Sequence, residues 1–145
     1  MTATAKRLVA LALVLMLVFS LSIPAFAATK PTATHSYSTN QYVRRGNTYA
    51  LTFRLRSGSY TVQRGYYRSR FSTDMYRNSN SRHVDYTNFV YFTGNVSYTI
   101  RWKFGSGTYA RNTWYKLRYR TQYRKTWNSS TWYTGASKFM YFYVQ

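Results

Sequence analysis

The chain has no cysteine and no glutamate, and its 145 residues include only two aspartates and two histidines. Without cysteine, no disulfide can stabilise the fold, and no thiolate can act as a nucleophile or bind zinc. Catalysis by side chains depends on acids, bases and nucleophiles with tuned pKa values, and these residue types are nearly missing. The composition therefore predicts a protein that is not an enzyme and that needs no cofactor and no metal.

One small group of titratable residues is the exception. His83 and Asp85 would share a face if they lie on a strand, and Asp74 precedes them. They could hold a metal or act as an acid/base pair, but a hydrolytic metal site usually has three protein ligands and a general base. Both carboxylates are therefore expected to be arginine partners. The enzyme alternative is a small basic nuclease of the ribotoxin type. Such a nuclease normally needs Glu or a second placed His, and His35 lies in the flexible lead-in expected at residues 28–36. The role of His83 and Asp85 stays open at this stage.

An apolar run near the N-terminus has the three parts of a secretory signal peptide. Lys6 and Arg7 precede an uncharged apolar run over residues 8–23, and residues 25–27 form a small-x-small cleavage sequence. A membrane span of about 20 residues is the alternative, but the run is short for one. We predict that residues 1–27 are a signal peptide and that the protein is secreted and associated with the cell surface. A secreted chain without disulfides favours a bacterial host.

The charge balance is the second strong constraint. Twenty-one Lys and Arg residues oppose two Asp, for a formal net charge of +19. A cationic surface can serve solubility alone, because net charge opposes self-association. Solubility, however, is served by either sign of charge. The one-sided balance therefore predicts a polyanionic partner, either an anionic polymer or an anionic membrane surface, with nucleic acid as one possible polymer.

The rest of the sequence predicts an all-β domain. Tyr, Thr, Val, Phe and Trp are abundant, and no long 3.6-residue periodicity is present. About seven short antiparallel strands predict a single small β-sandwich, with a distorted β-barrel as the alternative. We predict a flexible lead-in at residues 28–36 and a β domain at residues 37–145. The strands are expected near residues 37–43, 49–56, 59–67, 84–92, 96–104, 113–127 and 137–144.

Three connections carry specific expectations. Gly94 and Asn95 predict a two-residue hairpin turn that joins the strand at 84–92 to the strand at 96–104. A bulge near Asn88 would reconcile a change of face inside the first of these strands. The polar residues 76–82 are expected to form a mobile loop.

Three of the expected strands are two-faced, with apolar residues on one alternation and cations on the other. In a sheet they would present rows of cations beside aromatic side chains, a pattern that suits phosphate or carboxylate binding by arginine and stacking by aromatic rings. The predicted anion-binding residues are Arg54, Arg56, Arg101, Lys103, Lys116, Arg118, Arg120 and Arg124.

The final strand differs because it is apolar on both alternations. The stretch at 138–144 fits a central strand that is buried on both sides, which we favour, or an aromatic surface that awaits a partner. Taken together, the sequence predicts a secreted protein that binds an anionic polymer such as teichoic acid, an acidic glycan or extracellular nucleic acid. The alternatives are a cationic antibacterial protein that acts on anionic membranes and a self-assembling matrix protein.

Overall fold

The structure is a computed structural model, and it describes residues 27–145. The expected signal peptide lies outside the described residues except for Ala27. The described part is all-β and contains eleven strands and no helix, so it also contains no helix that could span a membrane. The strands are β1 (Thr32–Thr34), β2 (Asn40–Val43), β3 (Thr48–Arg56), β4 (Val62–Gln63), β5 (Tyr66–Tyr67), β6 (Ser69–Arg77), β7 (His83–Tyr86), β8 (Val90–Phe92), β9 (Asn95–Lys103), β10 (Thr113–Tyr123) and β11 (Tyr133–Val144).

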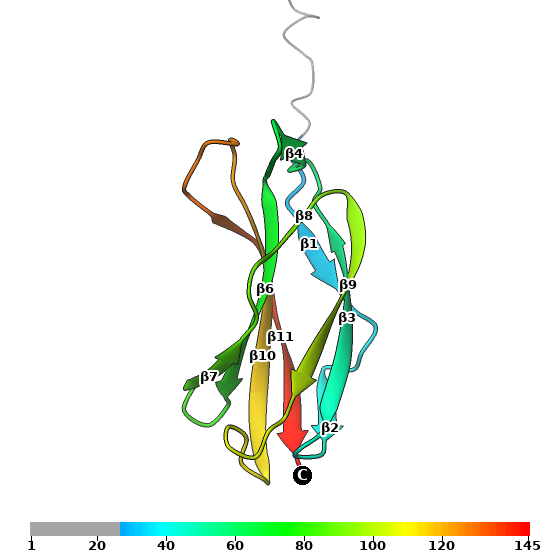
Figure 1. Cartoon of the computed structure of the whole chain (residues 1–145), viewed down its shortest axis with the longest axis vertical. Coiled ribbons are helices and arrows are strands. Elements are labelled where there is room, and N and C mark those ends of the chain that lie inside the picture. Colours follow the sequence, from blue (N-terminus) through cyan, green and yellow to red (C-terminus); the bar gives the residue numbers. More distant parts are fainter. Residues whose placement is uncertain (1–26) are drawn as a thin grey trace, which may run out of the picture.

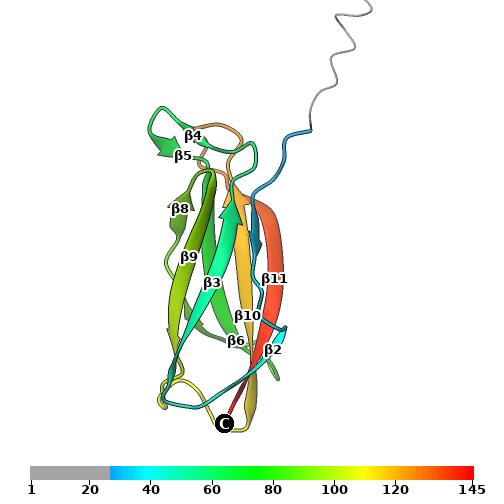
Figure 2. The same ribbon diagram turned by 90° about the vertical axis from the view of Figure 1, so that its right-hand side faces the viewer.

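Two sheets pack face to face in an elongated, sandwich-like arrangement (Figures 1 and 2). Sheet A has the strand order β1-β3-β9. Sheet B has the order β2-β11-β10-β6-β7, and β8 also pairs with β6. The short β4–β5 hairpin extends one end of the molecule, and the C-terminus lies at the other (Figure 2). The sheets do not close into a barrel.

Aromatic side chains fill the space between the two sheets. Phe53 of sheet A lies with its ring centroid 5.1 Å from the rings of both Phe71 and Tyr119 of sheet B. Toward the C-terminal end, Phe104 packs against Phe142 with centroids 5.3 Å apart. Tilted and edge-on ring pairs of this kind add about 0.5–1.5 kcal/mol each to the free energy of area burial. A protein without disulfides thus has a continuous aromatic core.

The alternation expected for the three two-faced strands is observed. Along β10, burial alternates from Tyr115 to Tyr123, so that every second side chain faces the core. The cations between them face outward. Strands β3 and β9 show the same pattern, with Leu51, Phe53 and Trp102 inside.

The central strand β6 was not predicted from the sequence. Strand β6 pairs with β10 over nine residues, from Ser69 to Arg77. Its inward positions hold Ser69 and Thr73 as well as Phe71 and Met75, and all four are buried. Small hydroxyl residues at half of the inward positions hide the apolar alternation that marks a strand. The expected mobile loop at 76–82 therefore begins later, after β6 has ended.

The expected strand at 84–92 is divided in two. Strands β7 and β8 pair with different parts of β6 and are separated by residues 87–89, so an interruption stands where a bulge near Asn88 was expected. Gly94 has φ +65, as a glycine turn requires. The hairpin prediction is nevertheless wrong, because β8 belongs to sheet B and β9 to sheet A. Gly94 carries the chain from one sheet to the other.

Two further expectations differ from the structure. The lead-in at 28–36 contains β1, which pairs with the end of β3 and buries Ala33. The strand expected at 59–67 is a turn followed by the two-residue strands β4 and β5, with Arg64 and Gly65 both at positive φ. These short strands, the extra β1 and β6, and the divided β7 and β8 explain why eleven strands are present where about seven were expected.

Candidate anion-binding face

The eight predicted anion-binding residues do not form one surface. Four of them lie on the outer face of sheet A, and the other four lie on or just beyond the outer face of sheet B, on the opposite side of the sandwich. The sheet A group consists of Arg54, Arg56, Arg101 and Lys103, and the sheet B group of Lys116, Arg118, Arg120 and Arg124.

The cations of the sheet A group lie opposite small or polar residues of the neighbouring strand. Arg54 and Arg56 lie opposite Ser97 and Asn95 in the register of β3 with β9. At the other end of the same pair of strands, Arg101 lies opposite Ala50. Because the aromatic side chains of β3 and β9 face the core, the expected interleaving of cations with exposed rings does not occur here. These cations are exposed.

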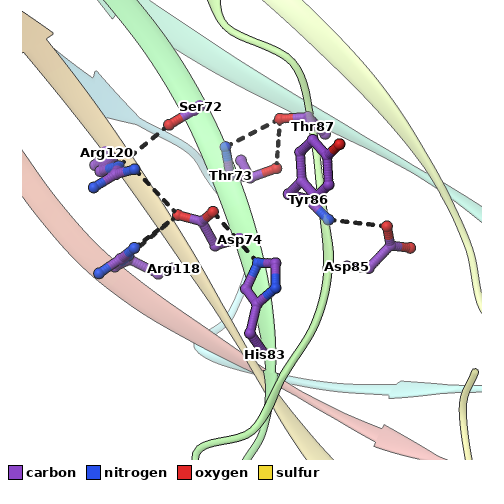
Figure 3. Close-up of polar contacts among 9 residues, drawn as sticks. All are labelled: Ser72, Thr73, Asp74, His83, Asp85, Tyr86, Thr87, Arg118 and Arg120. Carbon is purple, nitrogen blue, oxygen red and sulfur yellow. Dashed lines mark hydrogen bonds and ion pairs between the residues drawn. The ribbon is translucent and has the colours of Figure 1, made fainter.

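The outer face of sheet B has a different character, because its cations are held by neighbouring side chains. Arg118 and Asp74 are direct cross-strand partners between β10 and β6. Arg118 Nη2 donates to Asp74 Oδ2 at 2.9 Å, and Arg118 Nε donates to the same oxygen at 3.3 Å (Figure 3). The guanidinium carbon of Arg118 also lies 5.3 Å from the ring centroid of Tyr76. Arg118 is therefore already paired with an anion.

The carboxylate of Asp74 also contacts two further side chains. Arg120 Nη2 lies 3.7 Å from Asp74 Oδ2, and His83 Nε2 lies 3.6 Å from Asp74 Oδ1 (Figure 3). Arg120 Nε in addition donates to Ser72 Oγ at 3.3 Å. One carboxylate thus balances a group of two arginines and a histidine, and its side chain is only 14% exposed. The expectation that this carboxylate is an arginine partner is confirmed.

Asp85 turns away from this group. The register of β6 with β7 shifts between Met75 and Tyr76, so Asp85 lies opposite the buried Met75 while His83 lies opposite Tyr76 on the outer face. Asp85 accepts a hydrogen bond from the Tyr109 hydroxyl at 3.3 Å rather than from an arginine. Burial, with the nearby Asp85 carboxylate, raises the pKa of Tyr109 far above its usual value. His83 and Asp85 therefore do not share a face, and the expected arginine partner of Asp85 is not found in the described part of the chain.

The strongest cation cluster of the face includes Arg70, which the sequence prediction missed because β6 was not recognised. Its guanidinium carbon lies between two rings, 3.7 Å from the centroid of Phe89 and 4.1 Å from that of Trp132. Arg70 Nε donates to Gln122 Oε1 at 3.0 Å. Arg124 lies over the same indole, 5.2 Å from its centroid. Two cations therefore share Trp132.

The positive charges of the arginines in this cluster exceed the negative charge near them. Partial burial lowers the pKa of Arg70, and the positive charges of Arg120 and Arg124 lower it further, against the opposing effect of Tyr91, whose side-chain oxygen accepts a hydrogen bond from the guanidinium. The described residues contain only two acidic side chains, Asp74, which contacts two arginines and a histidine, and Asp85, which is turned toward Tyr109. Close cations without an anion repel one another, so an external anion at this cluster would be stabilised.

Aromatic side chains occupy the other end of the same face. Trp114, Tyr143 and Tyr42 form a group in which the Trp114 and Tyr143 ring centroids are 5.1 Å apart. Phe139 is 42% exposed farther along β11, opposite Arg118. The interpretation of the final strand as buried on both sides is thus wrong, since Met140, Phe142 and Val144 face the core while the alternate residues line the outer face.

Residues 27–145 contain no group of three His, Asp or Glu side chains close enough to hold a metal ion. Comparison of the chain with protein-family models, with curated proteins and with solved structures finds no match. The face is therefore interpreted from its own geometry and charge.

Proposed function

We propose that this chain is a secreted, non-enzymatic protein that binds an anionic polymer along the outer face of sheet B. The observation that carries the proposal is the cluster of Arg70, Arg120 and Arg124, which has a large excess of positive charge over the shared Asp74 carboxylate. The signal-peptide pattern of residues 1–27 supports export, and the scarcity of acids, bases and nucleophiles supports a binding role.

Preorganisation favours sheet B over sheet A as the binding face. A guanidinium that is stacked on a ring and held by a hydrogen bond loses less side-chain entropy when it binds an anion than a free surface arginine does. Arg70 is held in both ways, by the rings of Phe89 and Trp132 and by Gln122, while Arg120 is held by its hydrogen bond to Ser72. Among residues 27–145, none of the sheet A cations lies over an aromatic ring, so they contribute mainly to the long-range attraction of a polyanion.

The polymer class includes teichoic acid, acidic glycans and extracellular nucleic acid, as expected from the sequence. Alternate residues of a strand lie about 6.6 Å apart, so Lys116, Arg118 and Arg120 form an evenly spaced row along β10. An extended polymer with regularly spaced negative charges can follow such a row.

Two double variants with the same loss of charge test the proposal. Arg120→Gln with Arg124→Gln changes the sheet B face, and Arg54→Gln with Arg56→Gln is the matched control on sheet A. Binding of wall teichoic acid, a sulfated or uronic glycan and DNA is measured by anisotropy or retention over a series of salt concentrations. We expect the sheet B variant to weaken binding and to flatten the log-log salt slope by about 0.7–0.9 for each lost nucleic-acid phosphate contact.

The sheet A variant controls for net charge. It should retain most of the affinity, because it alters only long-range attraction. Equal losses in the two variants would show that charge alone drives binding, without a particular face. If the wild-type protein binds none of the three polymers in a salt-dependent way near physiological ionic strength, the proposal is wrong.

Action on anionic membranes is a second candidate, and the β4–β5 end of the molecule favours it. Tyr66 is 54% exposed, Tyr67 is 42% exposed and Val62 is 40% exposed at this tip. Tyrosines next to cations suit the headgroup level of a bilayer. Dye leakage from anionic vesicles, absent with zwitterionic vesicles, would support this candidate, and intact vesicles at saturating protein would exclude it.

A further inference from the structure

A groove lies at the end of the sheet B face where the β4–β5 hairpin meets the connection between β10 and β11. Its volume is about 360 Å³. Figure 2 shows the hairpin and this connection together at one end of the molecule. Arg124 joins them, because its Nε donates to the carbonyl oxygen of Tyr67 at 3.1 Å. The groove is lined by Gly65, Tyr66, Tyr67, Tyr91, Arg124 and Trp132.

Rings and cations alternate around this groove. Arg124 lies between Tyr66 and Trp132, at 5.8 Å and 5.2 Å from their ring centroids. Trp132 also contacts Arg70, whose guanidinium carbon lies 4.1 Å from the indole centroid. The ring centroids of Tyr66 and Trp127 are 5.8 Å apart. The Tyr67 and Tyr91 rings lie 6.4 Å apart across the groove. A flat ligand can therefore meet aromatic faces while an attached anion meets arginine.

The exposure of these rings indicates that they are not simply part of the core. Tyr91 is 48% exposed, and Tyr66 and Tyr67 are exposed to a similar extent. Exposed rings beside uncompensated arginines combine the two elements that bind single-stranded nucleic acid, a stacking platform and a positively charged path for the backbone.

The side chains that line the groove suit some classes of anionic polymer better than others. Poly(alditol phosphate) has phosphates but no flat ring, so the aromatic faces would gain little from it. Sugar hydroxyls need good acceptors as well as donors, but no carboxylate or side-chain amide is among the six described residues of the lining. The nearby Gln122 Oε1 already accepts from Arg70. Nucleobases stack without any such partner.

We propose that this groove binds the bases of single-stranded nucleic acid, with the phosphates on Arg70, Arg120 and Arg124. The inference rests on the proposed binding of an anionic polymer by the outer face of sheet B. A duplex keeps its base faces stacked inside the helix, so it offers the groove only phosphates. From the groove the backbone continues along β10, past Arg118 to Lys116.

Three labelled ligands test the role of the bases, namely a short oligothymidylate, its duplex with oligoadenylate, and an abasic oligomer with the same number of phosphates. Fluorescence anisotropy with the full mature chain gives the dissociation constants. Stacking contributes enough for each base that we expect the oligothymidylate to bind at least about fivefold more tightly than the abasic oligomer. The abasic oligomer should still bind in a salt-dependent way.

The double variant Tyr67→Ser with Tyr91→Ser locates the stacking site. Both side chains are exposed, so the fold should survive, as a thermal melt would verify. The preference for oligothymidylate over the abasic oligomer should fall toward one, while binding of the abasic oligomer remains salt-dependent. Tyr42→Ser, at the opposite end of the face and 64% exposed, is the control and should keep the preference.

The outcomes separate this inference from the proposed function. Equal affinity for oligothymidylate and abasic oligomer would overturn the inference and leave anionic-polymer binding intact. Tighter binding of teichoic acid or an acidic glycan, lost in the Tyr67 and Tyr91 variant, would overturn it in favour of that polymer. Absence of salt-dependent binding to every polymer would overturn both.

Discussion

Arg118 and Asp74 face each other across β10 and β6, and Arg118 Nη2 donates to Asp74 Oδ2 at 2.9 Å. This ion pair neutralises a residue that the sequence marks as a free cation. The positive charge that no carboxylate balances therefore lies mainly toward the β4–β5 end of the face, where Arg70 and Arg124 have no carboxylate partner among their described contacts.

Removing the shared carboxylate should strengthen anion binding. In Asp74→Asn, Arg118 and Arg120 lose their internal anion and become available to the polymer. We expect tighter binding and a steeper salt slope, by about 0.7–0.9 for each new nucleic-acid phosphate contact. The free energy of unfolding should fall by about 1–3 kcal/mol, because hydrogen bonds to a charged group are lost. Anisotropy titrations and urea denaturation measure the two effects, and unchanged affinity would show that the polymer does not reach these arginines.

Stability should depend on pH through His35. Burial lowers the pKa of His35, and the positive charge of Lys138 lowers it further, against the opposing effect of a hydrogen bond that the imidazole donates to the Tyr37 backbone. The unfolded chain, with the ordinary pKa of about 6.5, therefore binds the proton more readily than the folded one. The free energy of unfolding should decrease as pH falls below about 6.5, until the folded histidine also protonates. In urea titrations, His35→Gln should show a smaller decrease in the free energy of unfolding between neutral and mildly acidic pH than the wild-type protein. An identical decrease would show that His35 does not cause the pH dependence.

Gly135 should tolerate no side chain. A Cβ at this position would lie 2.7 Å from the Pro31 carbonyl oxygen and 2.8 Å from Thr121 Oγ1. Thr121 Oγ1 itself donates to the Pro31 carbonyl at 2.7 Å, so these atoms cannot move apart freely. Gly135→Ala should lower the free energy of unfolding by about 1–3 kcal/mol. Gly107→Ala, where nothing lies within 4 Å of the new Cβ, is the control and should change stability little. Equal melting temperatures for the two variants would contradict the close approach.

Export should leave Ala28 as the first residue of the mature protein. The next residue, Thr29, donates from its backbone N to Ser59 Oγ at 3.1 Å, and Ser59 N donates to the Thr29 carbonyl at 3.0 Å. Cleavage after Ala27 therefore preserves the contacts of the described N-terminal segment. Mass spectrometry of the exported protein measures the terminus, and retention of residues 8–23 would contradict the prediction of a cleaved signal peptide.

The sequence by itself determined the local features of the fold. Side chains of a strand alternate with a period of two, so the patterns around Leu117 and Phe53 were enough to predict strands with one buried face. Composition was enough to predict an aromatic core without disulfides and a surface with very few anions. The glycine turn at Gly94 was also recognisable, because positive φ is a property of single residues.

The tertiary structure decided which residues meet. Pairing of β6 with β10 brings Asp74 to Arg118. Packing of the β10–β11 connection brings Trp132 to Arg70 of β6 and Arg124 to Tyr66 of the β4–β5 hairpin. The same packing places Arg54 and Arg118 on opposite faces of the sandwich, although their strands show the same alternation. Alternation specifies only that a side chain points away from the core. Which sheet a strand joins depends on contacts between residues far apart in the chain, which period-two patterning does not encode.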